Sequence, residues 1–299
     1  MLIKEITIYE SDKVMKKILV VGGGITGLSA AYYIQKQLKE EQLYHEVRLV
    51  EASDRLGGKI GTVKRDGFTI ERGPDSFLAR KKAAVDLINE LGLENQLVRN
   101  ATGQAYIFVN GKLQKIPAGS FMGIPTEVQP FLFSRLFSIK GKLQASLDYI
   151  KPKGKRQADQ SLGLFFRRRF GDELVENLIE PLLSGIYSGD IDDMSLMATF
   201  PNFYELEQKH GSLIKGLRKT MPKKPKSKVK KRPGMFLTLK DGFESIVESL
   251  EKSLSNIISK GISVDHIEKK ADRYHVLLSD ATVYEADAII VTVPHREVG

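Results

Sequence analysis

The sequence predicts an α/β fold in which a domain with a parallel sheet is interrupted by a long helical segment. A short apolar run, KILVV at 17–21, leads through consecutive glycines into a helical pattern at 25–40. A second apolar strand pattern follows at 47–51, so the order is strand, helix, strand. From about 81 to 220 the pattern is mostly helical, and further strand patterns appear only after 235.

The first strand and helix are joined by a glycine-rich turn with the spacing G-x-G-x-x-G. Gly22 permits the tight turn, Gly24 lets the backbone approach a pyrophosphate, and Gly27 lets the helix pack on the strand. The free N–H groups at the helix start would face the phosphates. A glycine-rich turn without a ligand is the alternative interpretation. The residues expected to hold the pyrophosphate are Gly22, Gly23, Gly24, Ile25, Thr26 and Gly27.

The second strand ends in a carboxylate at the expected distance from this turn. Glu51 lies 24 residues after Gly27 (51 − 27 = 24), close to the spacing of about 20 typical of the residue that accepts hydrogen bonds from an adenosine ribose. The sequence therefore predicts a Rossmann-like, dinucleotide-binding βαβ unit. The carboxylate would repel a 2′-phosphate, which argues against a 2′-phosphorylated cofactor.

The next stretch distinguishes FAD from NAD. EASDRLGGKIGTV at 51–63 contains Arg55, Gly57, Gly58 and Lys59, and it resembles the R-x-G-G continuation of FAD-containing amine oxidases, phytoene desaturases and protoporphyrinogen oxidases. FAD reaches further than its adenylate half, so a second glycine turn and a cation can meet its pyrophosphate and ribityl chain. We therefore predict FAD as the cofactor, with a simple hairpin turn as the alternative interpretation of Gly57 and Gly58.

Composition excludes several other kinds of chemistry. The chain has no cysteine, so thiolate nucleophiles, disulfides, Cys-ligated zinc and iron–sulfur clusters are ruled out. Its five histidines are scattered without a metal-ligand spacing such as H-E-x-x-H. We predict no metal site, and we expect any redox chemistry to come from a bound organic cofactor.

The N-terminal segment and the lengths of the apolar runs indicate where in the cell the protein is located. No stretch approaches the roughly 20 apolar residues that a membrane span requires. Charged residues interrupt 1–14, so we expect no signal peptide, a cytoplasmic location, and Met15 as the working start.

The net charge of +9 is concentrated in the segment 219–234, which holds seven lysines and one arginine among three prolines. We expect a solvated, mobile loop there. Because no aromatic residues are interleaved, a nucleic-acid partner is not expected. A loose, peripheral contact with anionic lipid stays open.

Four longer segments of the sequence indicate a particular protein family. GFTIERGPDSFLARKKAAVDLINELGLENQLV at 67–98, MGIPTEVQPF at 122–131, the segment 159–214 and ADAIIVTVPH at 286–295 resemble the bacterial, oxygen-dependent, FAD-containing protoporphyrinogen/coproporphyrinogen III oxidases. The resemblance covers essentially everything from Met15 onward. The match over 159–214 is more specific than the glycine fingerprint, which many unrelated families share.

The resemblance implies a reaction and roles for individual residues. It implies FAD-dependent oxidation of coproporphyrinogen III to coproporphyrin III in haem biosynthesis, with O2 as acceptor giving H2O2. Protoporphyrinogen IX is the alternative substrate. The flavin would accept the hydride, so no separate catalytic side chain is expected. The implied contacts are Glu51 and Ala52 at the ribose, Gly57, Gly58 and Lys59 at the pyrophosphate or ribityl chain, Gly73, Pro74, Asp75 and Ser76 near the isoalloxazine, Val264 on the adenine side, and Lys81 at the substrate.

The functions of two basic runs and of one apolar run can each be interpreted in two ways. Arg80, Lys82 and the run 167–169 could meet substrate carboxylates, although a solvated helix face is the better interpretation. The apolar residues of 129–143, near helical spacing, predict a core-facing helix stripe. An apolar pocket wall or a patch resting on a membrane is the alternative.

The predicted organisation has three parts. Residues 15–75 form the first part of an FAD-binding Rossmann-like domain, 76–234 a largely helical, substrate-binding insertion, and 235–293 the second part of the FAD-binding domain. Relatives continue beyond a segment like IIVTVPHREVG with a C-terminal FAD motif, which this sequence lacks. An inactive, truncated flavin-binding fragment and a different flavin oxidase acting on amines are therefore the competing hypotheses.

Overall fold

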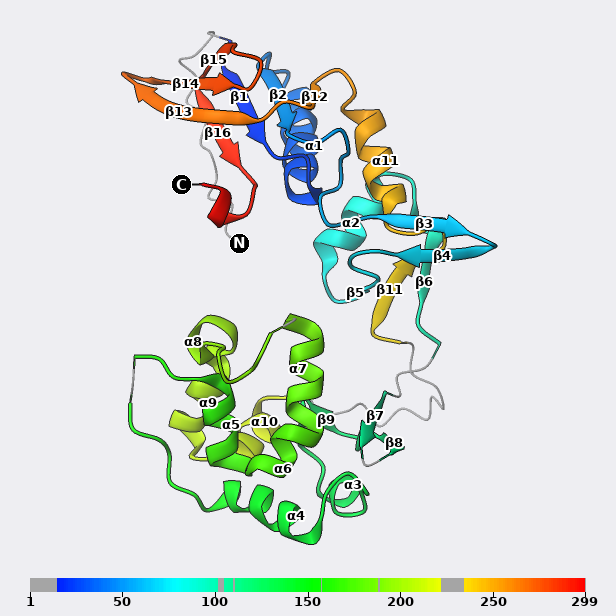
Figure 1. The fold of residues 1–299 in the computed structure, drawn as a ribbon, viewed down its shortest axis with the longest axis vertical. Coiled ribbons are helices and arrows are strands. Elements are labelled where there is room, and N and C mark those ends of the chain that lie inside the picture. Colours follow the sequence, from blue (N-terminus) through cyan, green and yellow to red (C-terminus); the bar gives the residue numbers. More distant parts are fainter. Residues whose placement is uncertain are drawn as a thin grey trace. The chain divides into compact units, whose positions relative to one another are not determined.

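The fold was obtained as a computed structural model, which describes residues 15–101, 105–109, 111–156, 158–187, 189–221 and 234–298 (Figure 1). The chain forms two compact units, which divide between Thr102 and Gly103 and again between Arg232 and Pro233. Unit 1 contains both ends of the described chain, and unit 2 is the segment between the two divisions. Each unit is described by itself below.

Unit 1 is built on a four-stranded parallel sheet. Strands β1 (Lys17–Val21) and β2 (Glu46–Glu51) lie side by side, joined by helix α1 (Ile25–Glu40). Strand β12 (Ile258–Lys260) pairs with β2, and β16 (Ala288–Val291) pairs with the other side of β1. The order is therefore β12-β2-β1-β16. The parallel pair β1 and β2 with α1 between them confirms the predicted Rossmann-like βαβ unit.

The sheet is covered on both faces because its strands are apolar on both sides. Val20 and Leu49 pack with Leu28 of α1 and with Leu250 of helix α11 (Glu244–Ser253) in one core cluster. Leu19, the neighbour of Val20, points to the other face. There it packs against an antiparallel meander of β13 (Val264–Lys270), β14 (Arg273–Leu278) and β15 (Val283–Ala286).

Unit 1 also contains a smaller antiparallel part beside α11 (Figure 1). Strands β5 (Phe77–Leu78), β11 (Phe236–Leu239) and β6 (Leu97–Arg99) form one sheet, and β3 (Thr62–Arg65) and β4 (Phe68–Glu71) form a hairpin. Helix α2 (Lys82–Glu90) and the single turn η1 (Glu94–Gln96) connect β5 to β6.

The division between the units differs from the predicted domain boundary at 75/76. Residues 76–101 belong to unit 1 for two physical reasons. Both β5 and β6 pair with β11, which follows unit 2 in the chain. Leu87 and Ile88 of α2 lie in the same core cluster as the parallel sheet. Pairing between distant strands is not visible in a local sequence pattern.

Unit 2 packs mainly helices around one aromatic-rich core. Phe165, Phe166 and Phe170 of helix α5 (Leu162–Phe170) are fully buried and in ring contact through Phe166. The remaining elements are hairpins β7 (Tyr106–Val109)/β8 (Lys112–Lys115) and β9 (Ser120–Phe121)/β10 (Ile124–Pro125), helices α3 (Val128–Leu132), α4 (Ile139–Ser146), α6 (Asp172–Leu174), α7 (Glu180–Tyr187), α8 (Leu196–Thr199), α9 (Pro201–His210) and α10 (Leu213–Thr220), and turn η2 (Leu147–Tyr149).

Pro181 lies at the start of α7, directly after a π-helical segment, η3 (Val175–Ile179). Proline has no N–H for the bond to the carbonyl four residues earlier, and π-segments are one way in which a helix absorbs such a defect. The helix is therefore not broken at Pro181 but changes its type directly before it.

The apolar stripe at 129–143 does not lie on one helix, so that prediction is wrong. Residues 133–138 separate α3 from α4, and the apolar side chains divide into two sets. Phe131, Leu136 and Phe137 lie in the core of unit 2, whereas Phe133 and Ile139 are 80% and 79% exposed.

A buried ion pair joins the helices of unit 2. The Arg169 guanidinium donates to the Asp148 carboxylate at 2.6 Å and to Glu207 at 3.3 Å, and all three side chains are fully buried. Asp148 also accepts from the hydroxyl of Ser212 at 2.6 Å and from the N–H of Ile214 at 3.0 Å, at the start of α10. This network links α5, η2, α9 and α10 in a medium where an unpaired charge would be costly.

Candidate functional site: two glycine turns at the end of the parallel sheet

The first glycine turn lies where β1 ends and α1 begins, between β2 and β16. Gly22 has φ +103°, a conformation that favours glycine, and its N–H donates to the carbonyl of Val50 at 2.9 Å. A Cβ on Gly27 would overlap the carbonyl oxygen of Gly22. The turn can therefore close against the helix only with glycine at position 27. This is the switch point of the sheet, where ligands bind in open α/β folds.

A second glycine turn is hydrogen-bonded to the first. The N–H of Gly57 donates to the carbonyl of Gly23 at 2.9 Å, and Gly57 and Gly24 form a parallel bridge. Gly57 and Gly58 have φ +95° and +58°. The structure thus brings the two glycine motifs together into one backbone surface, although 30 residues separate Gly57 from Gly27 (57 − 27 = 30).

This backbone surface can accept a pyrophosphate. A Cβ on Gly24 would have no neighbour nearer than the Cα of Gly58 at 3.9 Å, so the space in front of Gly24 is open. Gly24 is the N-cap of α1, no side chain caps that end, and the first turn holds no acidic residue. The uncapped N–H groups and the positive end of the helix dipole are therefore available to a phosphate, because no acidic residue of the first turn competes for them.

Glu51 ends β2 beside the first turn. One carboxylate oxygen accepts from the N–H of Gly23 at 2.6 Å, and the other accepts from the N–H and hydroxyl of Ser53 at 2.9 and 2.8 Å. Burial acts to raise the pKa of Glu51, but these hydrogen bonds and nearby Arg55 outweigh it, so the pKa lies below its ordinary value. The carboxylate stays ionised and can accept further hydrogen bonds from a ribose.

This depressed pKa gives a prediction for cofactor binding. The carboxylate contributes affinity and stability at every pH above the ordinary Glu value of about 4.3, and loses both only as pH falls through its lower folded-state pKa. FAD affinity measured by flavin fluorescence should therefore not decline between about pH 7 and about pH 5. Glu51→Gln should lower the affinity about tenfold across that range, because a charge-assisted acceptor becomes neutral. A decline centred near pH 6 in the unsubstituted chain would contradict this role.

Arg55 and Lys59, the two basic residues of the second turn, differ in their surroundings. The Arg55 guanidinium donates to the carbonyls of Leu56 at 3.1 Å, Ile60 at 2.6 Å and Gly58. It therefore shapes its own loop. Lys59 is exposed on that loop. A Cβ on Gly73 would overlap the carbonyl oxygen of Lys59, so the segment Gly73, Pro74, Asp75, Ser76 passes directly against the second turn.

The remaining predicted cofactor contacts lie near Glu51. Ala52 is exposed directly after it. The N–H of Ile262 donates to the carbonyl of Glu51 at 2.9 Å, which places Val264, two residues further on, close to the end of β2. Val264 is half-buried at the start of β13, where a bulge follows before His266. The structure thus brings the predicted adenine-side residue to the same edge of the sheet as Glu51, the predicted ribose-binding carboxylate.

Thr292 is part of this site although the sequence reasoning did not single it out. It follows β16, and its hydroxyl lies 2.9 Å from the carbonyl of Val21 and 3.1 Å from that of Gly22. If Gly22 and Gly27 carried Cβ atoms, these atoms would lie 2.9 and 2.8 Å from the Thr292 hydroxyl oxygen. The available signal was a hydroxyl residue directly after a buried parallel strand, at the edge where the first turn was expected.

Replacing Thr292 tests this packing. Thr292→Val keeps the shape and removes the hydroxyl, so a carbonyl of the first turn loses its partner. We expect a loss of about 1 kcal/mol in unfolding free energy and a several-fold weaker FAD affinity. Thr292→Ser, which keeps the hydroxyl, should restore FAD affinity in the same titration. Equal affinity of the Val and unsubstituted chains would show that the hydroxyl does not position the turn.

The predicted substrate residue lies at the start of α2. Lys81 is the N-cap residue of α2 and is exposed together with Arg80 and Lys82. The arginines at 167–169 are not available as substrate-capturing side chains, so that candidate interpretation is wrong. Arg167 pairs with Asp192 at 3.3 Å, Arg168 pairs with Glu207 at 2.9 Å, and Arg169 is buried. Nor is Arg169 solvated, because it neutralises two buried carboxylates.

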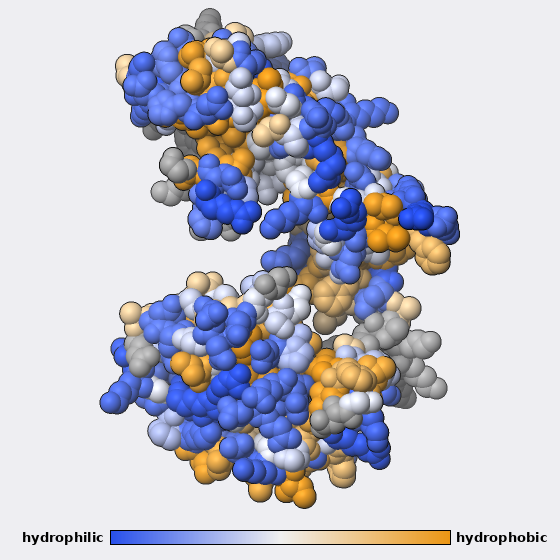
Figure 2. Space-filling view, viewed as in Figure 1, coloured by the Kyte–Doolittle hydropathy of each residue, from blue (hydrophilic) through white to orange (hydrophobic). Residues whose placement is uncertain are grey.

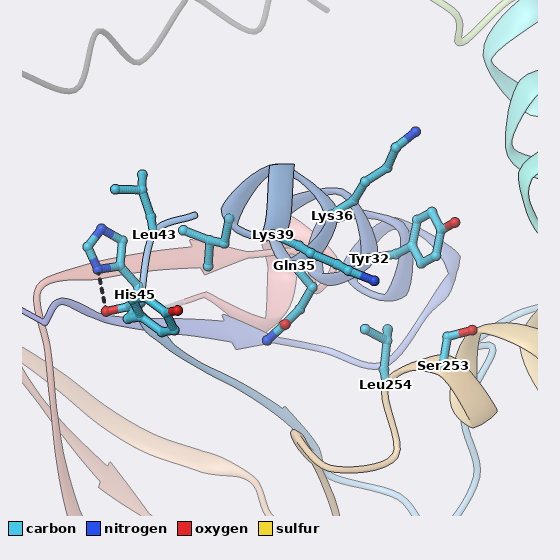
Figure 3. Close-up of a pocket in the computed structure, with 10 residues that line it drawn as sticks. Tyr32, Gln35, Lys36, Lys39, Leu43, His45, Ser253 and Leu254 are labelled. Atoms are coloured by element: carbon cyan, nitrogen blue, oxygen red, sulfur yellow. Dashed lines mark hydrogen bonds between the residues drawn. The ribbon is translucent and has the colours of Figure 1, made fainter. Parts of the chain in front are cut away.

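A groove of about 600 Å3 lies on unit 1 away from the glycine turns (Figure 3). It is bordered by the second half of α1, the loop after it and the end of α11. Lys36, at its rim, is engaged by Glu90 at 2.9 Å. Helices rise about 1.5 Å per residue, so the groove is remote from Gly24, and none of the predicted site residues lines it.

The described residues offer neither a metal site nor a membrane-spanning helix. Among the described residues, no group of three or more His, Cys, Asp or Glu side chains is placed to hold a metal ion. No helix in the described part of the chain is long and apolar enough to cross a membrane. The predicted basic loop at 219–234 lies largely outside the described residues, as does the extension at 1–14.

A parallel sheet with two joined glycine turns and a carboxylate at the second strand end defines a dinucleotide-binding α/β protein. The chain belongs to the flavin containing amine oxidoreductase family, whose model matches residues 25–299.

Relatives within the family have names that match the predicted resemblance. A coproporphyrinogen III oxidase of Bacillus subtilis is 53% identical over 94% of this chain, and one of Staphylococcus aureus is 44% identical over 94%. A crystal structure from Exiguobacterium sp. 255-15, named for protoporphyrinogen oxidase, matches 95% of this chain with 42% identity and a TM-score of 0.77. These findings confirm the resemblance to the coproporphyrinogen/protoporphyrinogen oxidases. The chain spans 60%, 61% and 61% of the lengths of these three proteins.

Proposed function

We propose that the chain serves the FAD-dependent oxidation of coproporphyrinogen III to coproporphyrin III, with O2 as electron acceptor, in haem biosynthesis. The observation that carries this proposal is the pair of joined glycine turns beside Glu51, in a chain whose relatives at 53% and 44% identity are named for this reaction. Protoporphyrinogen IX is the alternative substrate, favoured by the name of the Exiguobacterium structure.

FAD is the flavin that this site suits. FMN lacks the adenosine and the second phosphate, so it would leave Glu51 and the open end of α1 without their ligands. FAD has both, and the open space in front of Gly24, beside the turn at Gly57, has room for a pyrophosphate. Glu51 and its hydrogen-bonded neighbour Ser53 would take the ribose hydroxyls.

In the proposed mechanism, the protein binds and orients, and the bound flavin supplies the hydride acceptor. The N–H groups at the start of α1 would hold the pyrophosphate, and the turn at Gly57 would fix its position. The segment from Gly73 to Ser76, exposed except for the half-buried Ser76, would lie along the flavin ring. Lys81, an exposed ammonium, would pair with a carboxylate of the porphyrinogen. We further assign unit 2, the largely helical segment between the two parts of unit 1, to substrate binding.

Electron balance sets the expected products. Each oxidation step removes a hydride and a proton from carbon and nitrogen of the porphyrinogen, and each transfer of two electrons to one O2 gives one H2O2. Formation of the aromatic porphyrin macrocycle drives the sequence forward. No strong nucleophile is required, which agrees with a site made of backbone, one carboxylate and one ammonium.

The test is an aerobic assay of the purified chain with added FAD, followed by porphyrin fluorescence and peroxide. We expect coproporphyrin to form faster than in protein-free controls, and faster than protoporphyrin from protoporphyrinogen IX. Lys81→Ala should raise KM for coproporphyrinogen. Oxidation of an amine without any porphyrin formation would overturn the proposal, and flavin binding without turnover would reassign the chain to a flavin-binding role.

A further inference from the structure

The hairpin β3/β4 is attached to unit 1 through the base of its two strands. Thr62 and Glu71, which face each other across the pair, are half-buried, and the remaining residues of both strands are exposed. Val63, Phe68 and Ile70 are 37%, 70% and 49% exposed, and Figure 2 shows hydrophobic surface over this hairpin. Because none of these apolar side chains is buried, polar contacts at the base hold the hairpin in place.

These polar contacts reach the start of helix α11. One carboxylate oxygen of Glu71 accepts from the N–H of Phe243 at 2.8 Å, and the other accepts from the hydroxyl of Thr62 at 2.8 Å. The Thr62 hydroxyl in turn accepts from the N–H of Glu244 at 3.2 Å. Phe243 is the N-cap of α11 and provides no side-chain cap of its own. Glu71 and Thr62 therefore supply acceptors for the N–H groups at this helix start, where the helix dipole also favours a carboxylate.

The segment Gly73–Ser76 lies between two anchored points. Before it, the N–H of Arg72 donates to the carbonyl of Gly61 at 2.7 Å, directly after the second glycine turn. After it, Phe77 begins β5, and the ring centroids of Phe77 and Phe243 are 6.0 Å apart. Both ends of the segment are therefore tied to the same small part of unit 1, where α11 begins.

Helix α11 also packs against the second glycine turn. A Cβ on Gly57 would lie 2.9 Å from a side-chain methyl of Val247 on α11. Val247 lies in the same core cluster as Leu56 and Ile60, which stand on either side of the turn. The start of α11 is therefore a common support for the turn that would fix the pyrophosphate and for the segment that would lie along the flavin ring.

We propose that Glu71 is a positioning residue that fixes the Gly73–Ser76 segment, and with it the flavin ring, relative to the second glycine turn. This inference rests on the proposed function, because the segment meets a flavin only if FAD is the cofactor. Glu71 acts through its neighbours, since both of its carboxylate oxygens are engaged by Phe243 and Thr62. Such supporting hydrogen bonds hold a binding residue in its productive geometry.

The first test is amide hydrogen exchange of the whole chain without FAD, followed by mass spectrometry. Glu71→Ala leaves the N–H of Phe243 without its acceptor, so peptides covering 72–77 and 243–246 should exchange about tenfold faster. Peptides covering the parallel sheet should keep their protection. Glu71→Gln still offers an acceptor to this N–H and should restore most of the protection.

The second test adds FAD and compares affinity and visible spectrum. Glu71→Ala should bind FAD about tenfold more weakly, and the absorbance bands of its bound flavin should be closer to those of free FAD. The spectrum separates positioning from a loss of stability, because a folded chain with a displaced segment still holds the pyrophosphate. Glu71→Gln should restore both affinity and spectrum.

Glu173→Ala is the matched control. Glu173 is also half-buried, and its two carboxylate oxygens accept from the N–H and the hydroxyl of Ser138, each at 2.6 Å, at the start of α4 in unit 2. The substitution therefore removes the same kind of contacts from the other unit. It should change neither the exchange of 72–77 nor the flavin spectrum.

Three results would overturn the proposal. The first is unchanged exchange of 72–77 in Glu71→Ala. The second is an equal rise in exchange throughout unit 1, which would make Glu71 a general stabilising residue. The third is a bound flavin with unchanged affinity and spectrum in Glu71→Ala. An unsubstituted chain that binds no FAD would instead contradict the proposed function, and the exchange result would still decide whether Glu71 positions the segment.

Discussion

Gly24→Ala is expected to weaken FAD binding about tenfold to a hundredfold while leaving the fold nearly unchanged. The added Cβ has no neighbour nearer than 3.9 Å, and the φ of −69° at Gly24 suits alanine. The fold should therefore lose no more than about 1 kcal/mol, the usual cost of alanine at an N-cap. The same methyl would occupy the open space that we assign to the pyrophosphate, and overpacking there costs about 1–3 kcal/mol of binding. Flavin fluorescence titration and thermal unfolding measure the two effects.

Two further glycines provide the controls. Gly27→Ala should lose both FAD affinity and stability, because its Cβ would overlap the Gly22 carbonyl oxygen. Gly185→Ala on α7, where nothing lies within 4 Å of the added Cβ, should change neither by more than about 1 kcal/mol. Unchanged FAD affinity in Gly24→Ala would mean that no phosphate lies in front of Gly24.

Arg169→Met is expected to destabilise unit 2 by about 3–5 kcal/mol. The substitution leaves the fully buried Asp148 carboxylate without its cation, whereas Glu207 loses one hydrogen bond and keeps its pair with Arg168. Breaking a buried pair in this way costs more than the pair itself contributes, because an uncompensated charge stays in a low dielectric. Thermal unfolding followed by circular dichroism would show the loss.

Arg135→Met is the matched control for that substitution. Arg135 is exposed in the same unit, and the loss of an exposed charge changes stability by about 1 kcal/mol or less. The account of the buried network would be wrong if Arg169→Met and Arg135→Met unfolded at the same temperature. Replacing both partners, with Asp148→Leu added to Arg169→Met, should recover part of the loss.

Local patterns predicted most of the elements around the parallel sheet. The strands at 17–21 and 47–51 and several of the strand patterns after 235 follow from alternation and periodicity within each segment. Strand β12 and the placement of 76–101 in unit 1 were missed because both depend on pairing between residues far apart in sequence. The stripe at 129–143 failed because apolar spacing alone cannot reveal the interruption at 133–138.

The parts of the candidate site that are formed by backbone atoms could be predicted from the sequence. Glycine spacing fixed the first turn, and strand length fixed the position of Glu51. The roles of Arg55 and Thr292 were not visible, because their side chains act on carbonyls of turns whose shape the sequence does not give. Arg169 shows the same limit, since three consecutive arginines gave no sign that the third is buried.

The central claim is that the joined glycine turns hold FAD. The most direct measurement is the visible spectrum of the purified chain after incubation with FAD and gel filtration. We predict retained flavin absorbance that co-elutes with the protein and is much reduced in Gly24→Ala of equal thermal stability. Complete loss of flavin from the unsubstituted, folded chain would contradict the claim.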